Sequence, residues 1–306
     1  MMIKGTPRSA RRVGSNRTAL IACMLLPSLL LLAVFLFLPL LRGIQLSFYT
    51  WDGIAPVMHR AWFDNYANVW SDPAFLQALS RTVIWWAMHL GLAVGGGLLL
   101  AALISEIRWR RAQTLFRSLA FVPHIMSLAV VGVIWSQLYH PTIGLLNGFL
   151  GAIGLDKLAE PWLGSTTFAL PAVGVASAWQ AYGFYLVIFL AAIQAVDPAL
   201  HEAAAIDGAG PWQRFRNITV PSLHNAISLV VVLAFINALK GFGTVWSMTE
   251  GGQDRSTELV AVYAYRQAFS LGDIGTASAA GLSIAVIAVV ISVGFNRWRD
   301  RAAVGR

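Results

Sequence analysis

Long apolar runs alternate with short polar segments along the chain, and this pattern repeats six times. Each run is close to the roughly 20 residues that an α-helix needs to cross a bilayer. The runs cover residues about 19–41, 83–105, 116–138, 168–195, 222–243 and 275–295. The pattern therefore predicts an all-α membrane protein with six transmembrane helices.

The overall composition agrees with this prediction. Of the 306 residues, 57% are hydrophobic and only 12% are charged, whereas soluble domains carry roughly 25% charged residues. The first run has a basic flank like that of a signal peptide, but it exceeds the typical h-region of about 7–15 residues. No small-x-small cleavage site follows it. We expect an uncleaved first span that is preceded by a basic tail of residues 1–18.

The basic residues predict the orientation of the spans. With the N-terminus in the cytoplasm, the cytoplasmic segments hold 15 of the 22 Lys and Arg residues, and the outer segments hold six. This excess follows the positive-inside rule. The prediction is a six-span permease domain over 19–295 and a basic C-terminus over 296–306, with both termini cytoplasmic. Because the basic residues flank spans and form no single patch, nucleic-acid binding is disfavoured.

The sequence shows no enzyme motif. There is no G-x-x-x-x-G-K-[ST] nucleotide loop, and no Cys/His cluster has the spacing of metal ligands. The six histidines are scattered, and the single cysteine, Cys23, lies within the first run. We expect no catalytic site, cofactor or metal, so a pump of this kind would need an energy source on another subunit.

The polar segment at 197–221 separates the fourth and fifth runs and is predicted to be ordered. Asp197 can cap a helix whose first turn accommodates Pro198. Gly208 can end that helix in a left-handed conformation, and Pro211 can begin the next one. The prediction is two short helices that hinge on glycine, suited to binding a partner outside the membrane. An amphipathic helix lying on the membrane surface is the alternative.

This segment resembles the EAA loop of bacterial ABC importer permeases. Glu202-Ala203-Ala204, Gly208 and Ile218-x-Val220-Pro221 stand at the spacing of that motif. A second segment, 242–269, is similar to a stretch found in carbohydrate-type permeases, both maltose-permease-like and glycerol-phosphate-permease-like. Asp64-Asn65-Tyr66 and Asp72-Pro73 resemble the lead into the family's second span.

The resemblance implies a type I ABC importer permease in the bacterial plasma (inner) membrane. Such a subunit pairs with a second permease subunit, two cytoplasmic ATPase subunits and an extracytoplasmic solute-binding protein. It also implies that Gly251 and Gly252 contact the binding protein. Gly243, Trp246 and Gln253 depart from the usual residues, which leaves the solute open between a sugar or polyol and a glycerol-phosphate-type molecule. The residues implied in ATPase coupling are Glu202, Ala203, Ala204, Asp207, Gly208, Ile218 and Pro221.

Polar and aromatic residues inside the later spans are candidates for the solute path, because polar groups in lipid usually face the interior of a bundle. Helix packing is the alternative for the aromatic residues. For Lys240 the alternatives are snorkelling to the outer interface and pairing with an anion. The candidates are Trp179, Gln180, Tyr182, Tyr185, Asn237 and Lys240.

Two further expectations concern the class of transporter and its helix packing. A self-contained secondary transporter or channel is the alternative function, although no clear inverted repeat is visible and Lys240 is the only charge well inside a run. In the second span, Gly91, Gly95, Gly96 and Gly97 are expected to allow close helix contacts.

Overall fold

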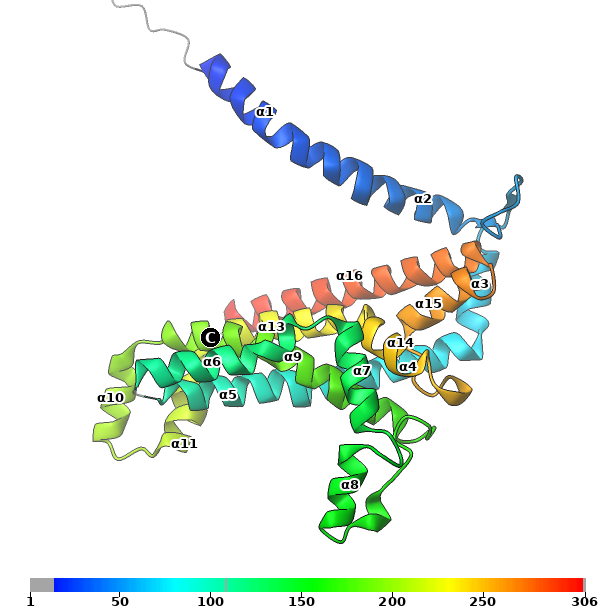
Figure 1. The fold of residues 1–306 in the computed structure, drawn as a ribbon. Helices are drawn as coiled ribbons and strands as arrows, with labels where there is room; N and C mark the ends of the chain where they lie inside the picture. The colour runs from blue at the N-terminus through cyan, green and yellow to red at the C-terminus, as the bar shows by residue number, and fades with distance from the viewer. Residues whose placement is uncertain (1–13, 108, 305–306) are drawn as a thin grey trace, which may run out of the picture.

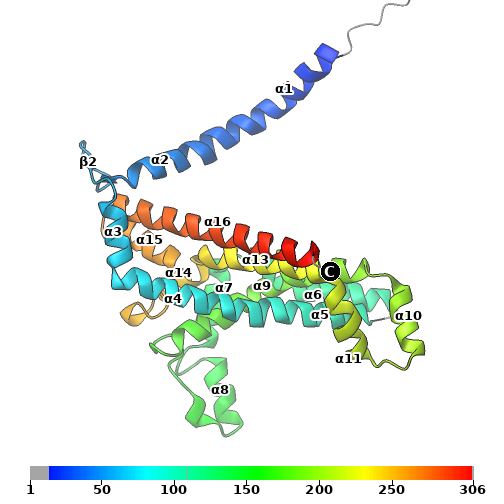
Figure 2. The ribbon, with the colours of Figure 1, turned by 180° about the vertical axis from the view of Figure 1, so that it is seen from behind.

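A computed structural model describes residues 14–107 and 109–304, so most of the predicted basic tail lies outside the described residues. The described chain is a bundle of long helices, seen from opposite sides in Figures 1 and 2. Four of its helices are long and apolar enough to cross a membrane, and the number rises to six if two bent helix pairs each count as one span. The all-α prediction is therefore confirmed.

The first span stands apart from the rest of the bundle (Figure 1). None of its most apolar stretch is buried within the chain. A π-helical turn interrupts it, and a two-stranded antiparallel hairpin follows, in which Tyr49 pairs with Arg60 and Thr50 with His59. These elements are α1 (Gly14–Leu32), η1 (Ala33–Phe37), α2 (Leu38–Leu46), β1 (Tyr49–Thr50) and β2 (His59–Arg60).

The second span begins ten residues before the apolar run that predicted it. Pro73 occupies its first turn, and the Asp72 carboxylate accepts a hydrogen bond from Ala74 N at 2.8 Å, so the cap fixes the helix start outside the apolar stretch. The span and the helix before it comprise α3 (Asp64–Ser71), α4 (Pro73–Met88), η2 (His89–Val94, a π-helical turn) and α5 (Gly95–Ser105).

The third run is not one straight helix. α6 (Arg110–Ile125) and α7 (Leu128–Leu138) meet at 95°. Met126 and Ser127 adopt extended backbone, and the Ser127 hydroxyl caps α7 by accepting from Val130 N at 3.3 Å. The sequence did not reveal this break because the apolar run is continuous. Ser127 makes the break possible by capping α7.

The fifth run shows a second bend, of 71°, between residues 211–222 and α13 (His224–Leu239). The fourth and sixth runs form straight helices, α9 (Ala169–Gln194) and α16 (Ile274–Val304). The remaining elements are α8 (Leu145–Ala152), η3 (Asp156–Leu158), α10 (Pro198–Ile206), α11 (Pro211–Arg214), η4 (Phe215–Thr219), α12 (Val220–Ser222), α14 (Gly243–Thr249), η5 (Gln253–Arg255) and α15 (Val260–Phe269).

The two ends of the bundle carry different elements. Both views place α10, α11 and the C-terminal end of α16 at one end, and α3, α15 and the hairpin at the other (Figures 1 and 2). The interior between the ends is apolar. One buried cluster joins α5, α9 and α13 through residues such as Ala101, Phe189 and Val230, and a second joins α4, α13, α15 and α16.

Close contact between α5 and α9 depends on one glycine. A Cβ at Gly97 would lie 2.9 Å from Leu186 N and 3.0 Å from Tyr182 O, whereas a Cβ at Gly91 or Gly96 would meet nothing within 4 Å. The expected close contact is therefore found at Gly97, and the expectation is wrong for Gly91 and Gly96 within this chain.

We expect Gly97→Val to lower the melting temperature of the purified protein far more than Gly96→Val. The two substitutions change helix propensity alike, from glycine to the better helix former valine. Only the first forces a side chain into backbone, and overpacking typically costs about 1–3 kcal/mol. The measurement is the fraction of monodisperse protein that survives heating in detergent. Equal loss in both variants would show that Gly97 does not set the α5–α9 distance.

Candidate transport site

The EAA segment forms the two short helices that its sequence predicts. The Asp197 carboxylate accepts from Ala199 N at 2.9 Å and caps α10, with Pro198 in the first turn. The chain leaves α10 through Gly208, whose φ of +80° is left-handed, and Ala209 N donates to Ala204 O at 2.9 Å. Pro211 then begins α11. The predicted helix, hinge and helix are confirmed.

The exposed surface of the EAA segment carries the acidic Glu202 on α10 and two large apolar side chains near the hinge. Glu202 and Ala203 are exposed on α10. Ile206 is 87% exposed and Trp212 is 66% exposed, which is unusual for large apolar side chains in water. Sequence reasoning missed these two residues, although their position beside the motif glycine could have indicated them. Such an apolar tip is suited to insertion into a cleft of another protein.

The second half of the motif returns to the bundle. Ile218 is half-buried within η4, and Pro221 is exposed at the start of the fifth span. A cavity of about 430 Å³ lies where the segment meets the turn after α5, and it is lined by residues that include Glu106, Glu202 and Arg214. The segment is thus held against the ends of the spans and does not hang free.

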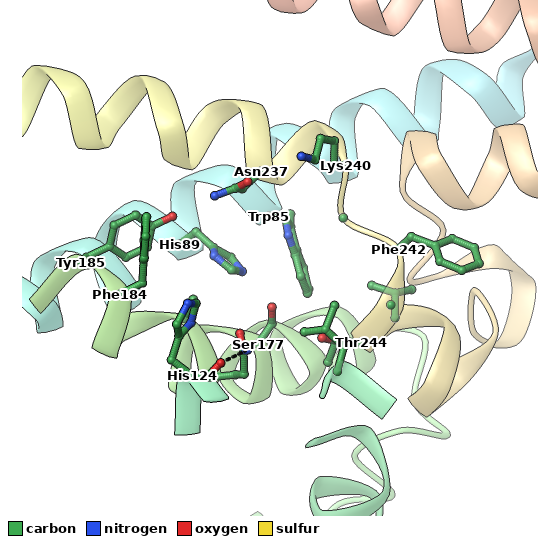
Figure 3. A pocket seen from close by; sticks show the side chains of 16 residues that line it. Trp85, His89, His124, Ser177, Phe184, Tyr185, Asn237, Lys240, Phe242 and Thr244 are labelled. Atoms are coloured by element: carbon green, nitrogen blue, oxygen red, sulfur yellow. Dashed lines mark hydrogen bonds between the residues drawn. The ribbon is translucent and has the colours of Figure 1, made fainter. Parts of the chain in front are cut away.

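A second cavity, of about 330 Å³, lies between the spans (Figure 3). α4 and η2 contribute Trp85 and His89 to its wall, and His124 comes from the end of α6. The other lining residues belong to α7, α9, α13, the link 240–242 and α14. They are Leu128, Ser177, Gln180, Ala181, Phe184, Tyr185, Asn237, Lys240, Gly241, Phe242, Gly243, Thr244 and Val245.

Broken helices deliver two of these residues. His89 is the first residue of the π-helical turn η2, and His124 lies one residue before the end of α6, at the 95° bend. The bend frees backbone carbonyls, and Gln180 Nε2 donates to His124 O at 3.2 Å and to Met126 O at 3.5 Å. Irregular backbone at membrane depth is tolerated where it lines a cavity and its polar groups find partners.

The structure brings together four of the six predicted path residues. Gln180, Tyr185, Asn237 and Lys240 line the cavity between the spans. Trp179 instead packs edge-on against Trp135, with ring centroids 5.7 Å apart.

Tyr182 points elsewhere. It lines a separate hollow beside α5 and α6 with apolar neighbours such as Leu100 and Phe116. For Trp179 and Tyr182 the structure thus supplies helix-packing contacts, and their role in the solute path stays a prediction.

Trp85, His89 and His124 also line the cavity, and sequence reasoning missed them. His89 is 8% exposed. Within the described part of the chain, neither its Nε2 nor Nδ1 of His124 has a hydrogen-bond partner. A buried polar atom without a partner costs about 1–3 kcal/mol. The signal available in the sequence was a histidine within each of two apolar runs, one of them directly after Pro123.

The predicted binding-protein contact lies in a tightly turned outer segment. Five of the six residues from Glu250 to Arg255 have positive φ, including Gly251 at +99° and Gly252 at +78°. Gly251 is buried, and a Cβ there would lie 2.7 Å from a guanidinium nitrogen of Arg266. The exposed residues of this segment are Glu250, Gln253 and Asp254, and contact by the glycines themselves stays a prediction.

A buried carboxylate anchors this outer segment. Glu258 is fully buried, with Arg255 Nε at 3.6 Å and Arg266 Nε at 3.7 Å from its Oε2. Arg266 also donates to Glu250 O at 2.9 Å. Burial raises the pKa of Glu258, and the arginines oppose that shift. These contacts tie the 250–258 segment to α15 through Arg266.

The nearby Tyr263 adds a hydrogen bond between α15 and the start of the second span. Its hydroxyl donates to Asp72 Oδ2 at 2.7 Å, which links α15 to the cap of the second span, and burial together with this contact raises the pKa of Tyr263.

Among the described residues, no group of three or more His, Cys, Asp or Glu side chains is placed to hold a metal ion.

A multi-span bundle with a cavity between its spans and a capped helical loop at one end is the architecture expected of a membrane permease. Residues 16–303 match the family model described as "Binding-protein-dependent transport system inner membrane component", and the chain belongs to that family. It is therefore a multi-pass inner-membrane permease of the ABC importer class. This membership excludes the alternative of a self-contained secondary transporter or channel.

Three comparisons show the breadth of the similarity. The chain is 32% identical to the probable ABC transporter permease protein YurN of Bacillus subtilis, over 91% of this chain and 95% of that protein. It is 32% identical to the diacetylchitobiose uptake system permease protein NgcF of Streptomyces coelicolor, over 94% and 84%. A bacterial alginate ABC transporter, solved with an alginate pentasaccharide-bound periplasmic protein, superposes with a TM-score of 0.81 at 26% identity, over 95% and 98%.

Proposed function

We propose that this chain forms half of the translocation path of an importer for a sugar or a related polyol. The observation that supports the solute class is the cavity between the spans, where Asn237 and Gln180 offer both donors and acceptors beside the ring of Trp85. Sugars need such a combination, because their hydroxyls require hydrogen bonds and their C–H faces pack on rings. The relatives named for diacetylchitobiose and alginate uptake support the same class.

The exposed elements of the chain indicate which partner subunits it binds. A second permease subunit would complete the cavity and cover the first span, which is exposed along its length here. Two ATPase subunits would receive α10 and α11, so that ATP is hydrolysed outside this chain and the chain itself is not an enzyme. A solute-binding protein would dock on the outer end, where Gly251 and Gly252 shape the turn.

The orientation is also part of the proposal. The turn after α5, the 197–221 loop and the end of α16 lie at one end of the bundle, and together these segments hold ten of the 22 Lys and Arg residues, against six in the outer segments. With that end in the cytoplasm, the loop faces the ATPases and both termini are cytoplasmic.

We expect Asn237→Leu to reduce sugar uptake by the assembled transporter about tenfold or more, because the solute loses a hydrogen-bonding partner inside a desolvated cavity. Asn225→Leu is the matched control, since Asn225 lies on the same helix, outside the cavity, and is exposed. The measurement is uptake into proteoliposomes that contain both permease subunits, the ATPases and the binding protein. Unchanged kinetics for Asn237→Leu would remove this residue from the path.

The same assay with Lys240→Gln separates the two solute classes. A phosphorylated polyol would lose a charge-assisted hydrogen bond, worth about 1.5–3 kcal/mol, and its uptake would fall more than tenfold. A neutral sugar would be transported nearly as well as by the parent protein. Uptake of neither class by the parent would contradict the proposed function.

A further inference from the structure

Two aromatic pairs face the cavity between the spans from different helices. Trp85 and His89, from α4 and η2, lie with ring centroids 5.0 Å apart and an interplanar angle of 36°. His124 and Phe184, from α6 and α9, stack at 5.3 Å and 30°. Figure 3 shows His89 and Trp85 on the side of α13, and His124 beside Ser177 on the side of α9. The cavity thus lies between ring surfaces.

The histidine of each pair has an unsatisfied nitrogen. Among residues 14–107 and 109–304, His89 Nε2 and His124 Nδ1 find no hydrogen-bond partner although both atoms are buried, and His89 as a whole is 8% exposed. Buried polar atoms in folded proteins are nearly always paired, so each exception requires an explanation. Both histidines line the cavity, and a ligand there would supply the missing partners once each ring turns its buried nitrogen toward it.

Both histidines also stand at backbone irregularities that the bundle maintains inside its spans. His89 opens a π-helical turn, a feature frequently found at functional sites, and His124 precedes the 95° bend. Helix packing alone does not require two backbone irregularities beside the same cavity.

The chemistry of the lining indicates the class of ligand. Neutral imidazole offers one donor and one acceptor, and a sugar hydroxyl can satisfy either. The ring faces suit the C–H face of a pyranose. The volume of about 330 Å³ is near the lower limit of ligand pockets, roughly 300 Å³, which suits a small sugar or one end of a longer chain.

We propose that His89 and His124 form a solute-binding pair that hydrogen-bonds the hydroxyls of a sugar ring held between the two aromatic pairs. This inference rests on the proposed sugar-import function and names two contact residues for it. The pair joins the second and third spans across the cavity, and its spacing sets which solutes fit.

The test is uptake by the assembled transporter in proteoliposomes, with a panel of radiolabelled mono- and disaccharides and the transported sugar then used as the probe. We expect His89→Leu and His124→Leu each to raise KM about tenfold, with the maximal rate changed less than twofold. His89→Asn keeps a hydrogen-bonding side chain and is expected to recover most of the affinity. His224→Leu, at an exposed histidine outside the cavity, is the control.

Three outcomes would overturn the proposed histidine pair. Uptake by the parent with unchanged KM in both leucine variants overturns the histidine pair and leaves the sugar-import function in place. Loss of assembled, monodisperse complex in the leucine variants, with His89→Asn no better than His89→Leu, assigns the histidines to packing and also overturns it. If the parent transports no sugar of the panel, the proposed function fails, and this inference fails with it.

Discussion

An assembled transporter that carries Glu202→Lys is expected to insert normally but to lose solute uptake by more than about tenfold. Glu202 is exposed on α10, next to alanines that allow close approach of a partner. Charge reversal there replaces attraction to a basic group on the ATPase with repulsion, and like charges juxtaposed at an interface cost several kcal/mol. A difference of 1.4 kcal/mol already corresponds to a factor of about ten.

Gly208→Pro is expected to uncouple the transporter for a different reason. Gly208 has φ of +80°, and proline is restricted to about −65°. Its N–H also donates to Ala205 O at 3.1 Å, a bond that proline cannot make. The hinge between α10 and α11 must then change direction, and a displaced rigid helix no longer transmits the push. Gly210→Ala is the control, because Gly210 has φ of −68°, which alanine adopts without strain, and its N–H keeps its bond to Gln213 Oε1 at 2.9 Å.

The measurement for both variants compares uptake with ATP hydrolysis stimulated by the solute-loaded binding protein. Glu106→Lys provides the charge control, since Glu106 is an exposed glutamate at the same end of the bundle and outside the motif. Normal uptake together with normal stimulated hydrolysis in Glu202→Lys and Gly208→Pro would show that the loop does not carry the coupling.

Glu258→Lys is expected to abolish the response to the binding protein. Glu258 is fully buried between Arg255 and Arg266, so the variant would place a third positive charge against two others. Removing one partner of a buried ion pair costs about 3–5 kcal/mol, and the partly exposed arginines favour the lower value. The left-handed turns at 250–255 would lose their anchor to α15.

Glu250→Lys is the matched control for this variant. It makes the same substitution in the same segment, but Glu250 is exposed and only its backbone carbonyl contacts Arg266. The readouts are protease sensitivity of the outer segment and hydrolysis stimulated by the binding protein. Equal behaviour of Glu258→Lys and Glu250→Lys would mean that the buried carboxylate does not hold the segment.

The same carboxyl gives a pH dependence of known sign. Burial raises the pKa of Glu258 above its ordinary value of 4.5, against the lowering effect of Arg266 and Arg255. A raised carboxyl pKa means that the contribution to stability is fully present below the unfolded pKa and is lost as pH rises through the folded pKa. Protonation relieves the desolvation of this carboxylate by more than it weakens the pairing with the arginines, so the outer segment should resist proteolysis better below pH 4.5 than at neutral pH. Glu258→Gln should weaken that dependence.

Local patterns in the sequence predicted the elements that depend on local physics. Apolar runs of bilayer length predicted the spans, because each helix satisfies its own backbone in lipid whatever its neighbours do. The EAA segment was predictable residue by residue, since Asp197, Pro198 and Gly208 act on the backbone within one turn of themselves. Even so, the Asp72 cap started the second span ten residues before its apolar run.

The bends and the choice of contact glycine came from tertiary structure. Gly91, Gly96 and Gly97 look alike in the sequence, but only Gly97 faces the backbone of α9, because helix rotation is set by packing. The break between α6 and α7 lies inside an uninterrupted apolar run. It is stable because a side chain from another span, Gln180, satisfies the carbonyls that it frees.

The sequence by itself determined the membrane class, the six runs, the helix–hinge–helix form of the 197–221 loop and four of the residues that line the cavity. Only the tertiary structure placed Trp85, His89 and His124 beside Asn237, and directed Trp179 and Tyr182 to other contacts. The reason is physical. A helix cap or hinge is a property of a few consecutive residues, whereas a cavity is formed where four helices meet, and the facing residues depend on rotations and bends that distant side chains stabilise.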